Sequence, residues 1–266
     1  MAKEVEMELN TLKVDKRDRV AYITLTRPEA LNAISPQVLI DLRQAITSAS
    51  EDTRMKAVVI TSGGRAFCAG ADLKYVSGFL EDIRAFVDYL EDFNGTMEAI
   101  EECPLPVIAA VNGFAFAGGM ELLMACDMAI AAEEAQIGDQ HQNFGLIGGP
   151  VMWQLPRRVG MPNAMELCLT GKWLTGQQAQ DYGLVLRAVP KDRLMDEVEE
   201  LLCQLRDKSR PGLIANKRAL KESAKHASFG PGTRVGASYT IHYMGGADEP
   251  REGIKAFLEK RKPVFK

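Results

Sequence analysis

The sequence lacks three things: a long apolar run, closely spaced cysteines and an excess of positive charge. No segment approaches the roughly 20 apolar residues that a membrane-spanning helix needs, so no membrane association is expected. Half of the first residues, Met1 to Glu6, are charged, and the segment lacks the apolar centre of a secretory signal peptide. The five cysteines are scattered and form no Cys-x-x-Cys pair. These absences predict a reduced, cytoplasmic protein.

Neither positive nor negative charge is in large excess. Thirty-two Lys and Arg residues stand against 36 Asp and Glu residues, which gives a formal net charge of −4. This slightly acidic balance argues against broad binding to a phosphate backbone, so no nucleic-acid partner is expected. Hydrophobic residues make up 46% of the chain and charged residues 26%, as in ordinary globular proteins, and this excludes a largely disordered chain.

Motifs that hold nucleotides or metals are missing. The TGK triplet at residues 170–172 has no upstream P-loop glycine, and no Gly-x-Gly-x-x-Gly follows the first expected strand. Asp139 and His141 lie two residues apart, but no second cluster completes a metal site. Cys68 and Cys126 flank glycine-rich turns and are interpreted as small packing residues rather than nucleophiles. We therefore expect neither a metal ion nor a separate cofactor.

Two periodicities alternate along the first two thirds of the chain. Short apolar runs rich in β-formers predict strands at residues 19–26, 56–61 and 107–111. Apolar residues at spacings of three and four predict a helix that begins at Ser35-Pro36 and another over residues 80–100. A further helix is expected to begin near Gly118. Such alternation is typical of an α/β fold with mainly parallel strands.

The pattern becomes purely helical past Pro190. Candidate helices cover residues 194–206, 213–227 and 252–260. No low-complexity linker separates this part from the rest. We therefore predict an α/β core over residues 1–190 and a helical C-terminal region over residues 191–266.

Two segments place small residues directly after an expected strand: AFCAGADLK at residues 66–74 and VNGFAFAGGMEL at residues 111–122. If a helix begins at Gly118, its first N–H groups are unpaired and lie at the positive end of the helix dipole. They would polarise a carbonyl oxygen and hold an enolate oxygen more strongly. Taken alone, the small residues also fit tight packing, and Glu121 fits a favourable partner for the dipole.

These segments occur with others in a fixed order. On this set of motifs the chain resembles the crotonase (enoyl-CoA hydratase/isomerase) superfamily from Val20 to Lys262. The resemblance implies a spiral of ββα units with a C-terminal helical trimerisation region, assembled as a homotrimer or a dimer of trimers. It also implies an acyl-CoA substrate, so that coenzyme A is part of the substrate. The motifs are LTRP at residues 25–28 with LNA at 31–33, AFCAGADLK, PVIAAVNGFAFAGGMELLMACDMAIA, LTGKWLTGQQAQDYGLV and the C-terminal AFLEKRKPVF.

The resemblance also assigns binding residues. The family's oxyanion hole maps onto the backbone N–H groups of Ala71 and Gly118. The segment around Ala71 would line the bent CoA chain, and two residues of the last helix would reach the CoA nucleotide, often from a neighbouring subunit. The implied CoA-binding positions are Ala69, Ala71, Asp72, Leu73, Lys74, Phe257 and Lys260.

The catalytic positions carry the main departure from the family. Its hydratases use two glutamates to hold one water and relay its proton. The first position is Glu121, but the second is His141. A neutral imidazole also accepts protons, and one negative charge fewer favours ionised Glu121. Asp139 is an alternative acid or base at this place, or a turn cap. The family's next turn has a proline two residues after Gly-Ile, and it is missing here, where residues 145–150 read GLIGGP. This departure predicts a reshaped pocket floor.

The leading interpretation is a hydro-lyase that adds water to, or removes it from, an α,β-unsaturated acyl-CoA thioester. Ala71 and Gly118 would hold the thioester oxygen, while Glu121 and His141 handle water and protons. Replacement of the second glutamate leaves open a one-base enoyl-CoA isomerase or a hydrolase of a cyclic β-keto acyl-CoA. A non-catalytic CoA- or RNA-binding member is a third alternative, against which the acidic charge and the presence of Glu121 argue.

Overall fold

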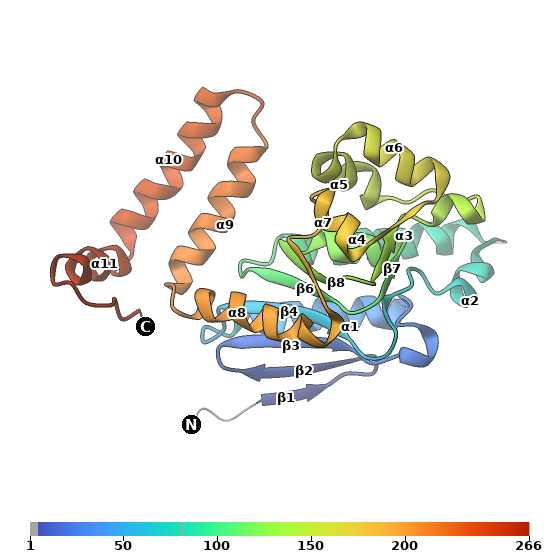
Figure 1. The fold of residues 1–266 in the computed structure, drawn as a ribbon, viewed down its shortest axis with the longest axis horizontal. Helices are drawn as coiled ribbons and strands as arrows, with labels where there is room; N and C mark the ends of the chain where they lie inside the picture. Colours follow the sequence, from blue (N-terminus) through green and yellow to red (C-terminus); the bar gives the residue numbers. More distant parts are fainter. Residues whose placement is uncertain (1–4, 81, 266) are drawn as a thin grey trace.

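Two β-sheets surrounded by helices form the body of the molecule, and a helical arm projects from it (Figure 1). The computed structural model describes residues 5–80 and 82–265. No helix within these ranges has both the length and the apolar character needed to cross a bilayer. The expected α/β fold with mainly parallel strands is confirmed, because strands and helices alternate up to residue 189.

The larger sheet contains seven strands among the described residues, in the order β1-β2-β3-β4-β6-β8-β11. The first three strands pair antiparallel, and every neighbouring pair from β3 to β11 is parallel. Residues of β4 and β6 are buried on both faces, which explains their continuous apolar sequences. The strands are β1 (Val5–Glu8), β2 (Leu12–Arg17), β3 (Val20–Leu25), β4 (Ala57–Ser62), β6 (Val107–Val111), β8 (Met128–Ala132) and β11 (Arg187–Val189).

The smaller sheet has the order β10-β9-β7-β5. Strands β5, β7 and β9 are parallel to one another, and β10 pairs antiparallel with β9. The chain alternates between the two sheets, since β4, β6 and β8 of the larger sheet are followed by β5, β7 and β9 of the smaller one. Helices follow each pair, which produces the expected spiral of ββα units. The strands are β5 (Ala66–Cys68), β7 (Phe114–Phe116), β9 (Gln136–Gly138) and β10 (Trp173–Thr175).

Helices enclose both faces of the larger sheet. Alternate residues of β4 enter different clusters, since Ile60 packs with α1 and α3, whereas Val59 packs with Val198 of α8. The helices of the body are α1 (Pro36–Glu51), α2 (Leu73–Val76), α3 (Ile83–Glu101), α4 (Gly118–Ala125), α5 (Pro150–Val159), α6 (Met161–Thr170), α7 (Gly176–Asp181) and α8 (Leu194–Arg206), with 3-10 helices η1 (Pro28–Ala30), η2 (Ser77–Leu80), η3 (His141–Phe144) and η4 (Lys191–Arg193).

The arm consists of α9 (Arg210–Ala224), α10 (Phe229–Gly246) and α11 (Glu249–Leu258). In Figure 1, α9 and α10 form a hairpin beside the body, and α11 lies at the end opposite to α2. The boundary at residue 190 stays a prediction. The first long helix beyond it, α8, packs on the sheet of the body, so only the later helices form the arm.

The helix predictions differ from the structure in detail. The long helix begins at Ile83 rather than at residue 80, and Glu81 lies outside the described residues. Ile83 and Val87 are 69% and 45% exposed, because the buried face of α3 starts only at Tyr89. Helix α10 was not predicted, since its glycine-rich sequence lacks an amphipathic pattern. The observed bounds of α9 and α11 also differ by a few residues from the predicted ones.

Candidate active site

Strand order in the smaller sheet brings the expected site residues together. Because β5, β7 and β9 are parallel neighbours, their carboxyl ends lie at the same edge of the sheet. Residues 69–71 follow β5, residues 117–118 follow β7, and residues 139–141 follow β9. Ligands of parallel sheets characteristically bind beyond the carboxyl ends of strands. The three segments are therefore placed side by side where a substrate would bind.

Asn32 anchors the loop that follows β5. The residue is 1% exposed and adopts a left-handed conformation with φ of 54°. Its side-chain amide donates to the carbonyl oxygens of Gly63 at 3.0 Å and Ala66 at 2.8 Å. Its Oδ1 accepts the backbone N–H of Arg27 at 2.9 Å. Asn32 thus connects the LTRP-LNA motif to residues 63–66, the segment that leads into β5 and the loop after it.

The backbone of Ile34 then holds the residues on either side of Ala71. The Ile34 N–H donates to the carbonyl oxygen of Gly70 at 2.8 Å, and the Asp72 N–H donates to the carbonyl oxygen of Ile34 at 3.0 Å. These contacts leave the Ala71 N–H without a protein acceptor among residues 5–80 and 82–265. The amide is therefore fixed in place and free to bind a ligand oxygen.

Gly118 brings a second amide beside the first. A Cβ placed on Gly118 would lie 3.4 Å from the Ala71 nitrogen, and one placed on Gly70 would lie 3.1 Å from the Gly118 nitrogen. The Gly118 N–H also has no hydrogen-bond acceptor in the described part of the chain. It begins α4, so the positive end of the helix dipole adds to its donor strength. Two free donors held close together suit a single oxygen that gains negative charge.

Ala117 directs this second amide. Its φ of 48° and ψ of −118° are rare for a residue with a side chain and cost about 1–3 kcal/mol. Its N–H donates to the carbonyl oxygen of Gly138 at 3.0 Å, and its own carbonyl oxygen accepts the N–H groups of Met120 and Glu121. The surrounding contacts therefore impose a backbone conformation that alanine alone would avoid.

Glu121 lies in the first turn of α4 and is 2% exposed. Its Oε1 accepts the backbone N–H of Val151 at 3.1 Å. Burial raises the pKa of the Glu121 carboxyl, and the charge of Asp139 adds to this increase. The charge of His141 and backbone N–H groups act in the opposite direction, but the net pKa stays raised. The raised pKa makes the Glu121 carboxylate a stronger proton acceptor than an ordinary glutamate.

His141 begins η3 and lies next to Asp139. Its Nδ1 contacts Oδ1 of Asp139, whose side chain is 2% exposed. Burial by itself lowers the pKa of the imidazole, but the hydrogen bond and charge of Asp139, together with the charge of Glu121, raise it above its ordinary value. Asp139, expected as an alternative acid, base or turn cap, is therefore placed against the imidazole.

Gly148 fits closely against the His141 ring. A Cβ at position 148 would lie 2.9 Å from both Cε1 and Nδ1 of His141 and 2.5 Å from a methyl carbon of Val151. Real Cβ contacts are longer than this, so the ring occupies the space that any side chain at position 148 would need. A proline at position 148 would therefore clash with the imidazole of His141, and this explains why the histidine and the missing proline occur together.

Gly148→Ala is expected to displace the imidazole, to destabilise the fold by about 1–3 kcal/mol and to lower activity. In a His141→Ala background the same substitution should cost less, because the clash with the ring is gone and only the contact with the Val151 methyl carbon remains. The measurement is a double-mutant cycle on the free energy of unfolding. Equal costs of Gly148→Ala in both backgrounds would contradict the steric explanation.

A largely apolar cavity of about 390 Å³ lies among η3, α5 and α6. Asp139 and Val151 are part of its wall, and the remaining wall residues are Gln142, Leu146, Ile147, Met152, Pro156, Met161, Ala164, Met165, Cys168 and Leu169. Apolar surroundings strengthen electrostatic interactions. The pairing of Asp139 with His141 is therefore stronger than it would be in water.

The expected CoA-binding loop has one residue already engaged. The Asp72 carboxylate pairs with Arg27 at 3.2 Å and accepts the Lys74 N–H as the N-cap of α2. Leu73 is 49% exposed, and Lys74 is also exposed at the surface. Ala69 is half-buried just after β5. Asp72 thus shapes the loop, and Leu73 and Lys74 remain accessible to a ligand.

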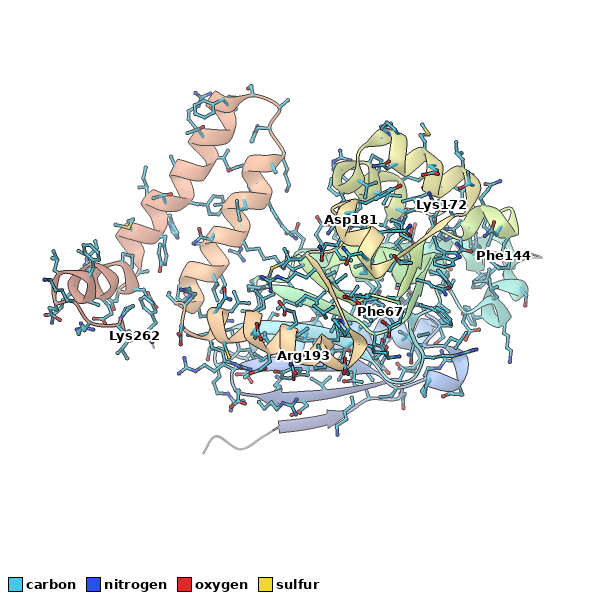
Figure 2. All side chains as sticks on the ribbon, in the orientation of Figure 1. Phe67, Phe144, Lys172, Asp181, Arg193 and Lys262 are labelled. Atoms are coloured by element: carbon cyan, nitrogen blue, oxygen red, sulfur yellow. The ribbon has the colours of Figure 1, made fainter. Side chains whose placement is uncertain are left out.

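The two expected CoA contacts of the last helix lie far from this loop. Phe257, 81% exposed, lies in α11, and Lys260 follows it. Figure 1 shows α11 and α2 at opposite ends of the molecule, and Figure 2 shows Lys262 and Phe144 at the same two ends. Within one chain, Phe257 and Lys260 therefore do not belong to the site.

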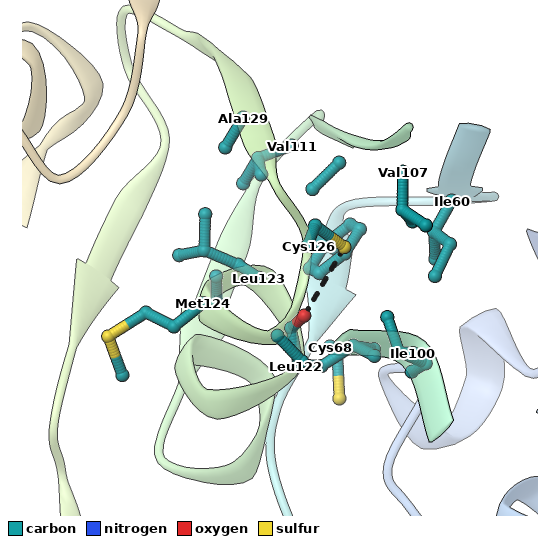
Figure 3. Close-up of a cluster of buried hydrophobic side chains, with 14 of the residues drawn as sticks. Ile60, Cys68, Ile100, Val107, Val111, Leu122, Leu123, Met124, Cys126 and Ala129 are labelled. Carbon is teal, nitrogen blue, oxygen red and sulfur yellow. Dashed lines mark hydrogen bonds between the residues drawn. The ribbon is translucent and has the colours of Figure 1, made fainter. Parts of the chain in front are cut away.

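The two cysteines beside the glycine turns are buried in the apolar core (Figure 3). The Cys126 thiol donates to the carbonyl oxygen of Leu122 at 3.4 Å. Burial raises the pKa of Cys68 to about 12 and that of Cys126 to about 12. Thiols of this kind are poor nucleophiles, which agrees with the packing role expected from the sequence.

Sequence reasoning missed the residues that hold the site in position. Asn32 lies in a motif that indicated the family, but the anchoring function of its side chain was not predicted. For Gly148 the signal was the absent proline. The unusual backbone conformation of Ala117 could not be predicted from the sequence, because alanine rarely adopts this conformation.

Comparison with known proteins decides the family. The sequence model described as enoyl-CoA hydratase/isomerase matches residues 15–266. The chain belongs to this family. A probable enoyl-CoA hydratase of Rhizobium meliloti is 37% identical over 262 residues, which cover 98% of this chain and 99% of that protein. A mitochondrial enoyl-CoA hydratase of Pongo abelii is 36% identical over 259 residues, covering 96% and 86% of the two chains.

Solved structures of the enoyl-CoA hydratase/isomerase family agree with this assignment. An enoyl-CoA hydratase of Bacillus anthracis is similar with a TM-score of 0.92 at 32% identity, covering 97% of this chain and 99% of the other. A structure from Geobacillus kaustophilus has a TM-score of 0.94 at 26% identity, covering 99% of both chains. The superfamily and the spiral α/β fold predicted from the motifs are therefore confirmed.

Proposed function

We propose that this family member hydrates α,β-unsaturated acyl-CoA thioesters, and that it also catalyses the reverse dehydration. The observation that carries the proposal is the close approach of two unpaired amides, from Ala71 and Gly118, with a buried acid and an imidazole near the carboxyl ends of β5, β7 and β9. The names of its relatives as probable enoyl-CoA hydratases support the same reaction class.

The charges of Glu121 and His141 favour a division of labour. Each group's charge stabilises the ionised form of the other, since His141 lowers the pKa of Glu121 and Glu121 raises that of His141. These mutual effects favour the pair of a carboxylate and an imidazolium, whereas two neighbouring carboxyl groups would compete to hold one proton. In the proposed resting state Glu121 is the base and protonated His141 is the acid.

The hydration step then balances as follows. Glu121 takes a proton from water as the water oxygen bonds to the β-carbon of the substrate. The electrons of the carbon–carbon double bond move to form an enolate, whose oxygen is held by the Ala71 and Gly118 N–H groups. The enolate takes a proton at the α-carbon from His141. Transfer of the proton from Glu121 back to His141 restores the starting state.

Binding of the CoA portion is proposed to involve a second copy of the chain. Phe257 and Lys260 lie at the end of the molecule opposite the Asp72–Lys74 loop, so a neighbouring subunit would have to supply them. A homotrimer or a dimer of trimers, as expected from the resemblance, meets this requirement. The proposed reaction needs no cofactor other than the coenzyme A of the substrate, and a cytoplasmic location remains part of the proposal.

Product analysis in H₂¹⁸O separates hydration from the alternatives. Purified protein is incubated with linear, branched and cyclic enoyl-CoA thioesters, and products are identified by mass spectrometry. The proposal expects the label at the β-carbon of a 3-hydroxyacyl-CoA. Label found only in a new carboxylate would instead identify a hydrolase, and a shifted double bond without label would identify an isomerase. Thioester binding without any product would identify a non-catalytic protein.

The pH dependence of kcat/KM is expected to be bell-shaped. Activity requires ionised Glu121, whose pKa is raised, so the acidic limb should lie above the ordinary pKa of a glutamate. It also requires protonated His141, whose pKa is raised, so the basic limb should lie above about 6.5. The two limbs belong to the coupled pair. His141→Ala should remove the basic limb. Activity that keeps rising to an alkaline plateau would show instead that neutral His141 acts as a base.

A further inference from the structure

We propose that Asp139 is a positioning residue that fixes the orientation and proton location of His141. The inference rests on the proposed function, because it assigns a partner to the group that donates the proton. Neither the family motif nor the hydratase chemistry requires a second carboxylate behind the histidine. The assignment comes from the contacts of residues 139, 141 and 148.

The first observation is the pairing itself. Oδ1 of Asp139 contacts Nδ1 of His141. Because an ionised carboxylate can only accept, the proposed arrangement has the imidazole donating its Nδ1–H to Asp139. Asp139 is 1% exposed and the His141 side chain 14% exposed. A carboxylate this deeply buried requires a partner that supplies a proton or a positive charge. His141 is the charged partner that the structure provides.

The second observation is that the ring is held from another side. Gly148 lies so near Cε1 and Nδ1 that even a methyl group would not fit between them. With Nδ1 engaged by Asp139, Nε2 is the ring nitrogen without a hydrogen-bond partner among the described residues. Held by Asp139 and Gly148 in this way, the ring has Nε2 left to exchange a proton with the substrate or with water.

The other groups that face Asp139 and His141 determine which protonation state of His141 is favoured. Glu121 of α4 interacts with the His141 charge from one side. Cys168 of α6 interacts with Asp139, and burial and this carboxylate together raise the pKa of its thiol to about 12, so it remains neutral. The apolar cavity wall provides no cation. His141 consequently interacts with two carboxylates, which favours its protonated form.

The wild-type protein provides the first test. The chain has three histidines, so ¹⁵N-histidine NMR yields few signals, and His141→Gln assigns the signal of interest. We expect Nδ1 to stay protonated throughout the titration, with loss of the Nε2 proton at a pH above the ordinary histidine value of about 6.5. A neutral ring protonated only at Nε2, or a lower titration midpoint, would overturn the inference.

Asp139→Asn provides the second test. The asparagine amide has nearly the same shape, but its N–H₂ donates to Nδ1 and favours the opposite tautomer. We expect kcat to fall about 10²- to 10⁴-fold with little change in KM, as for other Asp-to-Asn changes behind a catalytic histidine. The basic limb of the pH profile and the His141 titration should both move to lower pH. Unchanged values of kcat and of the titration would overturn the proposal.

Asp41→Asn is the matched control. Asp41 is also 1% exposed and accepts the Thr11 N–H at 2.8 Å and the Thr11 hydroxyl at 2.7 Å. This variant should lose stability but keep the His141 signal and the basic limb of the wild type. A shift of the His141 signal in Asp41→Asn as large as in Asp139→Asn would mean that the effect is merely structural, and would overturn the proposal.

The two proposals fail in different ways. The NMR titration is measured without substrate, so it reports on Asp139 and His141 whichever reaction the enzyme catalyses. Label at the β-carbon together with an Nδ1-unprotonated His141 would overturn only the role of Asp139. Absence of hydration together with the expected tautomer would overturn only the hydratase assignment.

Discussion

Glu121→Gln is expected to lower kcat for hydration about 10²- to 10⁴-fold while KM changes little. The amide has the same shape, and its oxygen still accepts the Val151 N–H that reaches Oε1 at 3.1 Å. It cannot take a proton from water, however, so the loss should appear in the chemical step. The measurement is the steady-state rate of hydration. A thiol assay for free CoA checks that the thioester is not hydrolysed. Activity close to that of the wild type would remove Glu121 from the proposed mechanism.

The same variant should be more stable than the wild type at neutral pH. Burial raises the pKa of Glu121, so the folded state binds this proton more tightly than the unfolded chain does. Stability associated with this group is therefore present at acidic pH and is lost as the pH rises from the ordinary glutamate value through the raised one. Denaturant unfolding of both proteins at several pH values should show the advantage of Glu121→Gln growing over that interval. An advantage that grows toward acidic pH would contradict the assigned direction.

Gly119→Ala is expected to destabilise the protein by more than about 3 kcal/mol or to prevent folding. A Cβ at this position would lie 2.0 Å from the carbonyl oxygen of Cys68 and 2.7 Å from its carbon. These are backbone atoms, so no flexible side chain can give way, and α4 would have to move from β5. That movement would separate the Gly118 and Ala71 amides, at a cost of about 10²- to 10³-fold in kcat for a lost donor.

Gly95→Ala is the control for this substitution. Gly95 lies in α3, and nothing would lie within 4 Å of its added Cβ. Alanine there should stabilise the helix by about 0.5–1 kcal/mol. The free energy of unfolding of both variants, measured by denaturant titration, provides the comparison. Equal stability and equal activity of the two variants would show that the close approach of α4 and β5 is not required.

Much of the site was predictable because its parts are local. Gly118 and Glu121 lie in one helical turn, and Ala71 follows a short strand, so a linear motif specifies each of them. The order of these motifs also indicated the family, which the comparisons confirm. Helix α10 was not predictable, because its glycines and polar residues carry no periodic signal and its place depends on packing against α9.

The sequence by itself determined the family, the α/β fold and the identity of the groups at the catalytic positions, since strand and helix periodicity and short motifs depend on near neighbours along the chain. Only the tertiary structure decided how those groups interact. The pairing of Asp139 with His141, the fit of the ring against Gly148 and the raised pKa of Glu121 all depend on burial and on the parallel order of β5, β7 and β9. Burial and contacts between distant segments arise from the packed chain, which is why no linear motif records them.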